Sequence, residues 1–354
     1  MIERRLQNGL SIVELLIALT IGLLLTLGLT QLFVGSRDNF RLAENTARIQ
    51  ESGRMAHEIL GHSVRNADYW GCVRHAQVAN VLNTANANYD PEFHDFEQAS
   101  GSAVEVRVAG TGDTAVAGTH IIRLKGSDQL GITLDGEMNN SSAVLDVTTN
   151  AGLNVNDILL LSDCSDGVVF QATDLPSNDK IQHNTGNPAV GPGNAKGVCP
   201  PGTPSAANCF PKAYATGEIF RVHTHQFEVR QGANGRRGLF RLDGINTLEL
   251  IDGVFDMRVQ LGEGAPGDGS VTRWVDADNA LTAVPPVNMD NVIALRISLL
   301  VEGPEDNVAS TNQQLCFPVW ADCAVGPNWT AADLRLYRSY SSVYSVRNRL
   351  LQQP

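Results

Sequence analysis

An uncharged run from Leu15 to Val34 constrains this chain more than any other feature of its sequence. As a helix that rises about 1.5 Å per residue, the run would cover about the 30 Å of a bilayer's hydrocarbon core. Glu14 is the last charged residue before it, and Arg37 is the first one after it. The run therefore predicts a membrane-spanning helix close to the N-terminus.

The surroundings of this run differ from those of a secretory signal. A secretory signal has a shorter apolar stretch and a small-residue cleavage site after that stretch. Here the only small-residue boundary, between Gly9 and Leu10, comes before the run. The basic pair Arg4-Arg5 precedes that boundary, so the positive-inside tendency places everything after Val34 on the outer face of a cytoplasmic membrane.

Glu14 is the unusual residue of this segment, because an ionised side chain in an apolar helix costs about 2.5–3.5 kcal/mol on insertion scales. If the chain is cut after Gly9, the new amino group of Leu10 in a neighbouring copy or related subunit becomes a partner for this carboxylate. A paired carboxylate and ammonium would hold two helices in register, since separation leaves two uncompensated charges. The alternative is that Glu14 simply lies at the depth of the lipid headgroups.

The segment Gly9-Leu10-Ser11-Ile12-Val13-Glu14-Leu15-Leu16 resembles the N-terminal motif of type IV prepilins and type II secretion pseudopilins. The resemblance implies cleavage after Gly9 by the prepilin peptidase, N-methylation of Leu10 and a role for Glu14 in assembly. Leu10 departs from the family pattern, in which the first mature residue is most often Phe.

Composition agrees with an exported protein that has a single anchor. The net charge of −12 argues against a nonspecific nucleic-acid binder. The six cysteines form no CxxC pair, and their even number suits an oxidising compartment, so we interpret them as disulfides.

The sequence divides into four parts along the chain. Residues 1–9 form the leader, residues 10–35 the transmembrane and assembly helix, and residues 36–66 its continuation. No proline interrupts the chain from Leu10 to Val64, and the second half of the helix has one apolar stripe. Residues 67–354 form a β-rich head with a loop insertion near 175–211, which is rich in Gly, Pro, Asn and Ser.

Short apolar and alternating runs in the head predict β-strands. The clearest are the alternation from Phe255 to Leu261 and the run from Val292 to Val301. Further strands are expected at 104–108, 120–124, 143–147, 158–161, 168–171 and within 337–347. The predicted fold class is α+β, with one long N-terminal helix packed on an antiparallel sheet.

Scattered segments of the head also resemble the PilW family of minor pilins. They are Asp163-Cys164-Ser165, Val169-Phe170-Gln171, Gly238-Leu239-Phe240-Arg241, residues 250–259, residues 294–300 and the ending Val346-Arg347-Asn348-Arg349-Leu350. The resemblance implies a pilin-like head and a non-enzymatic subunit that helps to start the type IV pilus, in twitching motility and adhesion. It also implies partners among other minor pilins, the major pilin and a tip adhesin.

Two alternatives to this function stay open. A minor pseudopilin of type II secretion would have the same anchor and a related head. An enzyme tethered by an uncleaved helix belongs to a different class and would need a polar pocket.

No catalytic motif stands out, and no cofactor or metal is expected. His223 and His225 lie two residues apart near a predicted strand, which places them on one face, but two imidazoles alone make a weak metal site. The five Asp-Gly pairs indicate turns and lack the ligand spacing of a calcium-binding EF-hand loop.

Proximity along the chain suggests one pairing of the cysteines. Cys316 with Cys323 and Cys199 with Cys209 would each close a short loop, which leaves Cys72 with Cys164. Six cysteines allow 15 connectivities, so this pairing is a hypothesis. The bond between Cys72 and Cys164 would attach the end of the helix to the sheet.

Overall fold

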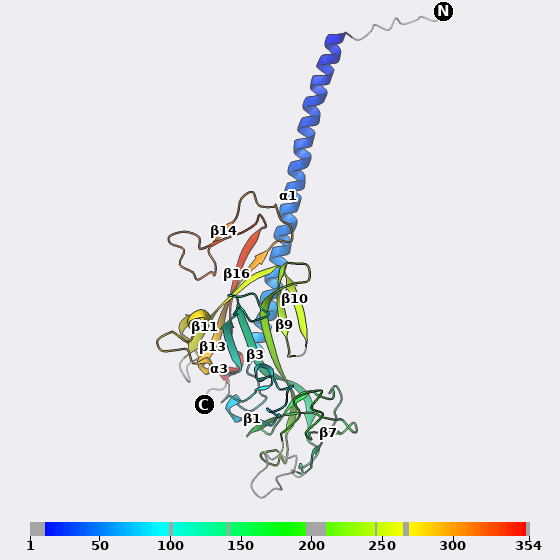
Figure 1. Cartoon of the computed structure of the whole chain (residues 1–354), viewed down its shortest axis with the longest axis vertical. Coiled ribbons are helices and arrows are strands. Elements are labelled where there is room, and N and C mark those ends of the chain that lie inside the picture. The colour runs from blue at the N-terminus through cyan, green and yellow to red at the C-terminus, as the bar shows by residue number, and fades with distance from the viewer. Residues whose placement is uncertain are drawn as a thin grey trace, which may run out of the picture.

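A computed structural model describes residues 11–98, 102–139, 142–195, 210–244, 246–264 and 269–351. One long helix, α1 (Ile12–Asn66), leads into a head built mainly of β-strands. Figure 1 shows the first half of α1 standing clear of the head and the second half lying against it. The α+β class agrees with this combination of an apolar helix and mostly antiparallel strands.

The sequence explains both ends of α1. No proline occurs in the helix, and Ser11 caps its first turn. At the other end, the N–H of Ala67 donates to the carbonyl of Val64, and Asp68 has a φ of 61°. The chain has already left the helical conformation at Ala67, whose ψ is 153°, and a right-handed helix could not continue through the left-handed Asp68, so α1 ends at Asn66.

The remaining elements follow in chain order. They are η1 (His75–Gln77), β1 (Val78–Asn80), α2 (Pro91–His94), β2 (Val104–Val108), β3 (His120–Thr133), β4 (Val144–Asp146), β5 (Ile158–Ser162), β6 (Gly167–Gln171), β7 (Lys180–Gln182), β8 (Glu218–Gln231), β9 (Arg237–Leu242), β10 (Thr247–Asp252), β11 (Val254–Gly264), β12 (Val271–Asp276), η2 (Ala277–Asn279), η3 (Met289–Asn291), β13 (Val292–Glu302), β14 (Gln314–Leu315), β15 (Trp329–Thr330), β16 (Tyr337–Ser345) and α3 (Arg347–Leu351).

A four-stranded antiparallel sheet packs against α1. Its strand order is β12-β11-β13-β16, and Leu295 of β13 lies opposite both Leu261 of β11 and Tyr344 of β16. In Figure 1, β16 runs beside the second half of α1. The C-terminal strand therefore joins the helix to the sheet.

The larger sheet is organised around a long antiparallel ladder of β3 and β8. Six of its strands have the order β1-β6-β5-β8-β3-β2. β9 pairs with the second half of β8, and β10 pairs with β9. All its pairs are antiparallel except β1 with β6. Two short pairs, β4 with β7 and β14 with β15, lie outside both large sheets.

The largest hydrophobic core lies between α1 and the two sheets. Ala56, Leu60 and Val64 face it from the helix, while Phe227 and Ile297 face it from β8 and β13. Two further cores enclose β5 and β6 on both faces, because neighbouring residues of each strand point into different cores. These strands therefore appear in the sequence as short continuous apolar runs.

Most predicted strands are present, some with longer bounds. The segment 104–108 is β2, and the expected strands at 120–124, 143–147, 158–161, 168–171, 255–261, 292–301 and 337–347 fall on β3, β4, β5, β6, β11, β13 and β16. The prediction gave no bounds for β8 and omitted β1, β9, β10, β12, β14 and β15. The segment expected to be a loop insertion contains β7, and residues 196–209 lie outside the described residues.

Candidate assembly site

Glu14 lies in the first turn of α1 and takes part in its cap. The backbone N–H of Ser11 donates to the Glu14 carboxylate at 3.2 Å, and the Ser11 hydroxyl accepts from the N–H of Val13 at 3.3 Å. Ser11 and Glu14 form a capping box, and their S-x-x-E spacing is the sequence pattern typical of that motif. Gly9 and Leu10, the expected processing residues, lie outside the described part of the chain.

The first half of α1 is a solvent-exposed apolar rod. Every residue from Ser11 to Phe40 is exposed, and the helix is long and apolar enough to cross a membrane. From Ile12 to Phe40 it extends about 43 Å, which exceeds the 30 Å of a hydrocarbon core. Thr20, Thr26 and Thr30 each donate a hydroxyl to a carbonyl three or four residues earlier, so these polar groups are satisfied within the helix.

A polar junction with the head starts at Arg41, directly after this exposed segment. Arg41 forms an ion pair of 2.8 Å with Glu305. Asn45 is fully buried, donates to the Arg41 carbonyl at 2.9 Å and accepts from the Glu305 N–H at 3.1 Å. Because these contacts fix both side chain and backbone, α1 is held at a set position on the loop after β13.

Two tyrosines of β16 pack directly on glycines of α1. The ring of Tyr340 lies against Gly53, and that of Tyr344 lies against Gly61. A Cβ added at Gly53 would come within 2.6 Å of the Tyr340 ring. The helix and the strand can approach this closely only because both positions lack side chains.

His57 lies between these two contacts and binds Tyr344. The Tyr344 hydroxyl donates to the His57 carbonyl at 2.8 Å and lies 2.9 Å from Nδ1 of the same residue. Burial lowers the pKa of His57 below its usual value, so the imidazole is neutral at pH 7.

A buried ion pair lies just after the C-terminal end of α1. Arg349 of α3 pairs with Asp68 at 2.7 Å and also donates to Ser102 and to the carbonyl of Val292. Both charged side chains are at least nine-tenths buried, and every one of these bonds joins distant parts of the chain. Removing one partner of such a pair would leave a buried charge uncompensated.

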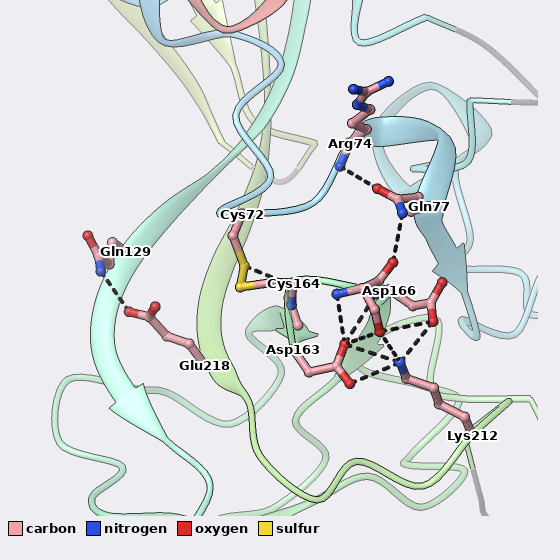
Figure 2. The surroundings of a disulfide bond; sticks show 11 residues. Cys72, Arg74, Gln77, Gln129, Asp163, Cys164, Asp166, Lys212 and Glu218 are labelled. Atoms are coloured by element: carbon pink, nitrogen blue, oxygen red, sulfur yellow. Dashed lines mark hydrogen bonds and ion pairs between the residues drawn. A yellow bond between two sulfur atoms is a disulfide. The ribbon is translucent and has the colours of Figure 1, made fainter. Parts of the chain in front are cut away.

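A disulfide between Cys72 and Cys164 follows the helix end, with a Cα–Cα distance of 4.9 Å. Figure 2 shows it beside Lys212, which pairs with Asp163 at 2.9 Å and Asp166 at 2.8 Å. The disulfide connects the chain after α1 to the turn between β5 and β6, and the Lys212 ion pairs connect that turn to the chain before β8.

The second described disulfide joins Cys316 to Cys323 and closes the loop after β14. Both bonds agree with the pairing suggested by proximity. Cys199 and Cys209 lie outside the described residues, so that third pair stays a prediction.

The two histidines of β8 lie on one face, as their spacing indicated. The rings of His223 and His225 stack with centroids 4.5 Å apart, and Nδ1 of His223 lies 3.3 Å from Asp128. Within the described ranges, no group of three His, Cys, Asp or Glu side chains could hold a metal ion.

Comparison with known families gives one match. Residues 226–348 match the family model PilW, described as type IV pilus-assembly protein W. The matched segment begins within β8 and ends in α3, so it contains the whole sheet that packs on α1. No curated protein and no solved structure matches the chain.

Proposed function

We propose that the protein is a minor pilin that helps to start the pilus, because residues 226–348 match the family model of the type IV pilus-assembly protein PilW. Its N-terminal helix would anchor it in the inner membrane with the head in the periplasm, after the prepilin peptidase cuts behind Gly9 and Leu10 is methylated. The observation that carries this proposal is that every residue of α1 from Ile12 to Phe40 is exposed, including the whole uncharged run from Leu15 to Val34.

The proposed mechanism is transfer of this rod from lipid into a bundle of similar helices. Lipid is as apolar as leucine, so burial alone would not drive the transfer, and close packing with polar pairing must do so. Glu14 would supply that pairing by binding the amino group of Leu10 in a neighbouring subunit. The junction at Arg41 and Asn45 would transmit the position of the helix to the head.

The proposed partners are other minor pilins, the major pilin and a tip adhesin, with the head in a complex at the pilus tip. A head of this size suits a rare tip position better than a repeating one. The PilW match supports contacts with pilus components in general, and the particular partners are part of the proposal.

Replacement of Glu14 by glutamine tests the proposed pairing. Glutamine can still accept the capping hydrogen bond of Ser11, so α1 should begin at the same residue while the charge is lost. We expect normal processing and membrane insertion of Glu14→Gln but loss of incorporation into sheared pili, measured by immunoblot.

The matched control is Asp38→Asn, which removes an exposed carboxylate from the same helix beyond the apolar run. It should incorporate normally. Normal incorporation of Glu14→Gln would contradict the proposal and would suit a tethered enzyme.

Deletion of the gene separates the minor pilin from the type II secretion alternative. A minor pilin of the pilus should be needed for twitching motility and dispensable for exoenzyme secretion. The reverse result would assign the chain to the secretion system.

A further inference from the structure

A gap in the larger sheet creates a cavity that the assembly helix does not use. β5 pairs with β8 from Glu218 to Arg221, and β9 pairs with the same edge of β8 from Gln226 onward. The residues between them, Val222–His225, pair with neither strand. A cavity of about 580 Å³ lies beside this gap, within the size range of small-molecule sites.

Stacked imidazoles and a carboxylate form one wall of the cavity. His223 and His225 stack at 4.5 Å, and the carboxylate of Asp128 on β3 lies 3.3 Å from His223. The Asp128 side chain is 68% exposed, so it can reach a ligand. The nearby imidazole lowers the pKa of Asp128, which is therefore ionised at neutral pH.

The cavity is acidic as a whole. Its lining contains four carboxylates, and its single guanidinium, Arg221, is already paired with Asp157 at 3.0 Å. Burial lowers the pKa of His225 to about 4 and also lowers that of His94, so these lining imidazoles do not offset the charge at pH 7. An anionic ligand would be repelled, whereas a cation would be attracted.

The aromatic lining does not suit a sugar. Phe93 is buried, with Arg123 over its ring at 5.9 Å and Gly244 packed against it. Phe96, which also lines the cavity, is buried as well, so neither ring offers an open face on which a sugar could stack.

We propose that this cavity binds an organic cation that carries guanidinium or ammonium groups. The N–H donors of the cation would bind the Asp128 carboxylate, and a planar guanidinium could stack on the imidazoles of His223 and His225. A basic peptide segment and a free polyamine present the same chemistry. The site belongs to the head and is independent of the role proposed for α1.

Calorimetry on the full-length chain in phosphatidylcholine nanodiscs tests the proposal. These lipids carry no net charge, and about 150 mM salt screens weak attraction to the acidic protein. The probes are spermidine and an octa-arginine peptide at about pH 7. We expect saturable binding of at least one probe; binding of the peptide alone identifies a peptide site, and binding of spermidine identifies a site open to free polyamines.

Asp128→Asn should weaken that binding by about tenfold, the loss expected for one charge-assisted hydrogen bond. Asp135→Asn is the matched control, because it removes an exposed carboxylate outside the cavity, and its affinity should stay within about twofold. Absence of saturable binding, or equal weakening by both variants, would overturn the proposal.

Histidine-selective NMR of the unmodified chain gives a second measurement that needs no variant. The probe should shift the imidazole signals of His223 and His225 and leave that of His62, which is exposed on α1. Binding without these shifts would also overturn the proposal.

Discussion

At the scale of single residues, the helix-to-head contact depends on the absence of two side chains. Gly53 and Gly61 admit the rings of Tyr340 and Tyr344, and a Cβ at either position would overlap with ring atoms. This role is not visible in the sequence, because the tyrosines lie far away along the chain and only the fold brings them to the helix. The capping role of Glu14, in contrast, can be predicted from the sequence, because its partner Ser11 lies only three residues away.

Alanine at Gly53 should therefore destabilise the head although alanine favours helices. The overpacked contact costs about 1–3 kcal/mol, against a propensity gain of up to about 1 kcal/mol. We expect Gly53→Ala to lower the free energy of unfolding of the full-length chain in detergent, measured in urea. Gly35→Ala, where nothing lies within 4 Å of the added Cβ, is the control. Equal stability of both variants would contradict the contact.

At the scale of elements, the spacing of apolar residues and the positions of glycine and proline predicted α1, β11 and β13. These patterns did not predict the extent of β8. One face of β8 carries polar side chains that are nonetheless buried, among them Gln226 and Glu228. Arg123 of β3 donates to Gln226 at 2.9 Å and to Glu105 at 2.9 Å, so hydrogen bonds rather than apolar contacts fill this face. An apolar alternation cannot reveal a strand whose burial depends on such a network.

The two described disulfides should differ in their contribution to stability. On the chain-entropy model, the bond between Cys72 and Cys164 spans 92 residues and should stabilise by about 4–5 kcal/mol, whereas the bond between Cys316 and Cys323 spans 7 and should give about 2.5 kcal/mol. Replacing each pair by serines and comparing urea unfolding of the two variants measures the difference. A larger loss of stability from the short loop would contradict this order.

At the scale of the whole molecule, buried neutral histidines make stability depend on pH. Burial lowers the pKa of His57, His75, His120 and His183, that of His183 to about 4. The unfolded chain binds these protons near pH 6.5, so it takes up more protons than the folded chain as the pH falls below that value. The free energy of unfolding is therefore highest above pH 6.5 and decreases on acidification.

His183→Gln should make this pH dependence smaller. Between pH 7 and pH 5, a histidine with a folded pKa near 4 contributes about 2 kcal/mol to the loss of stability. Urea unfolding of the wild-type chain and the variant at both pH values measures that share. The control is His62→Gln, an exposed position on α1 that should leave the slope unchanged. If the free energy of unfolding of His183→Gln changed with pH as much as that of the wild type, the lowered pKa of His183 in the folded chain would be contradicted.

We have proposed that the exposed first half of α1 is the assembly helix of a processed pilin. N-terminal sequencing and mass spectrometry of the chain purified from membranes test this claim most directly, because they report cleavage and methylation together. We expect the mature chain to begin at N-methylated Leu10. A chain that still begins at Met1 would contradict this proposal.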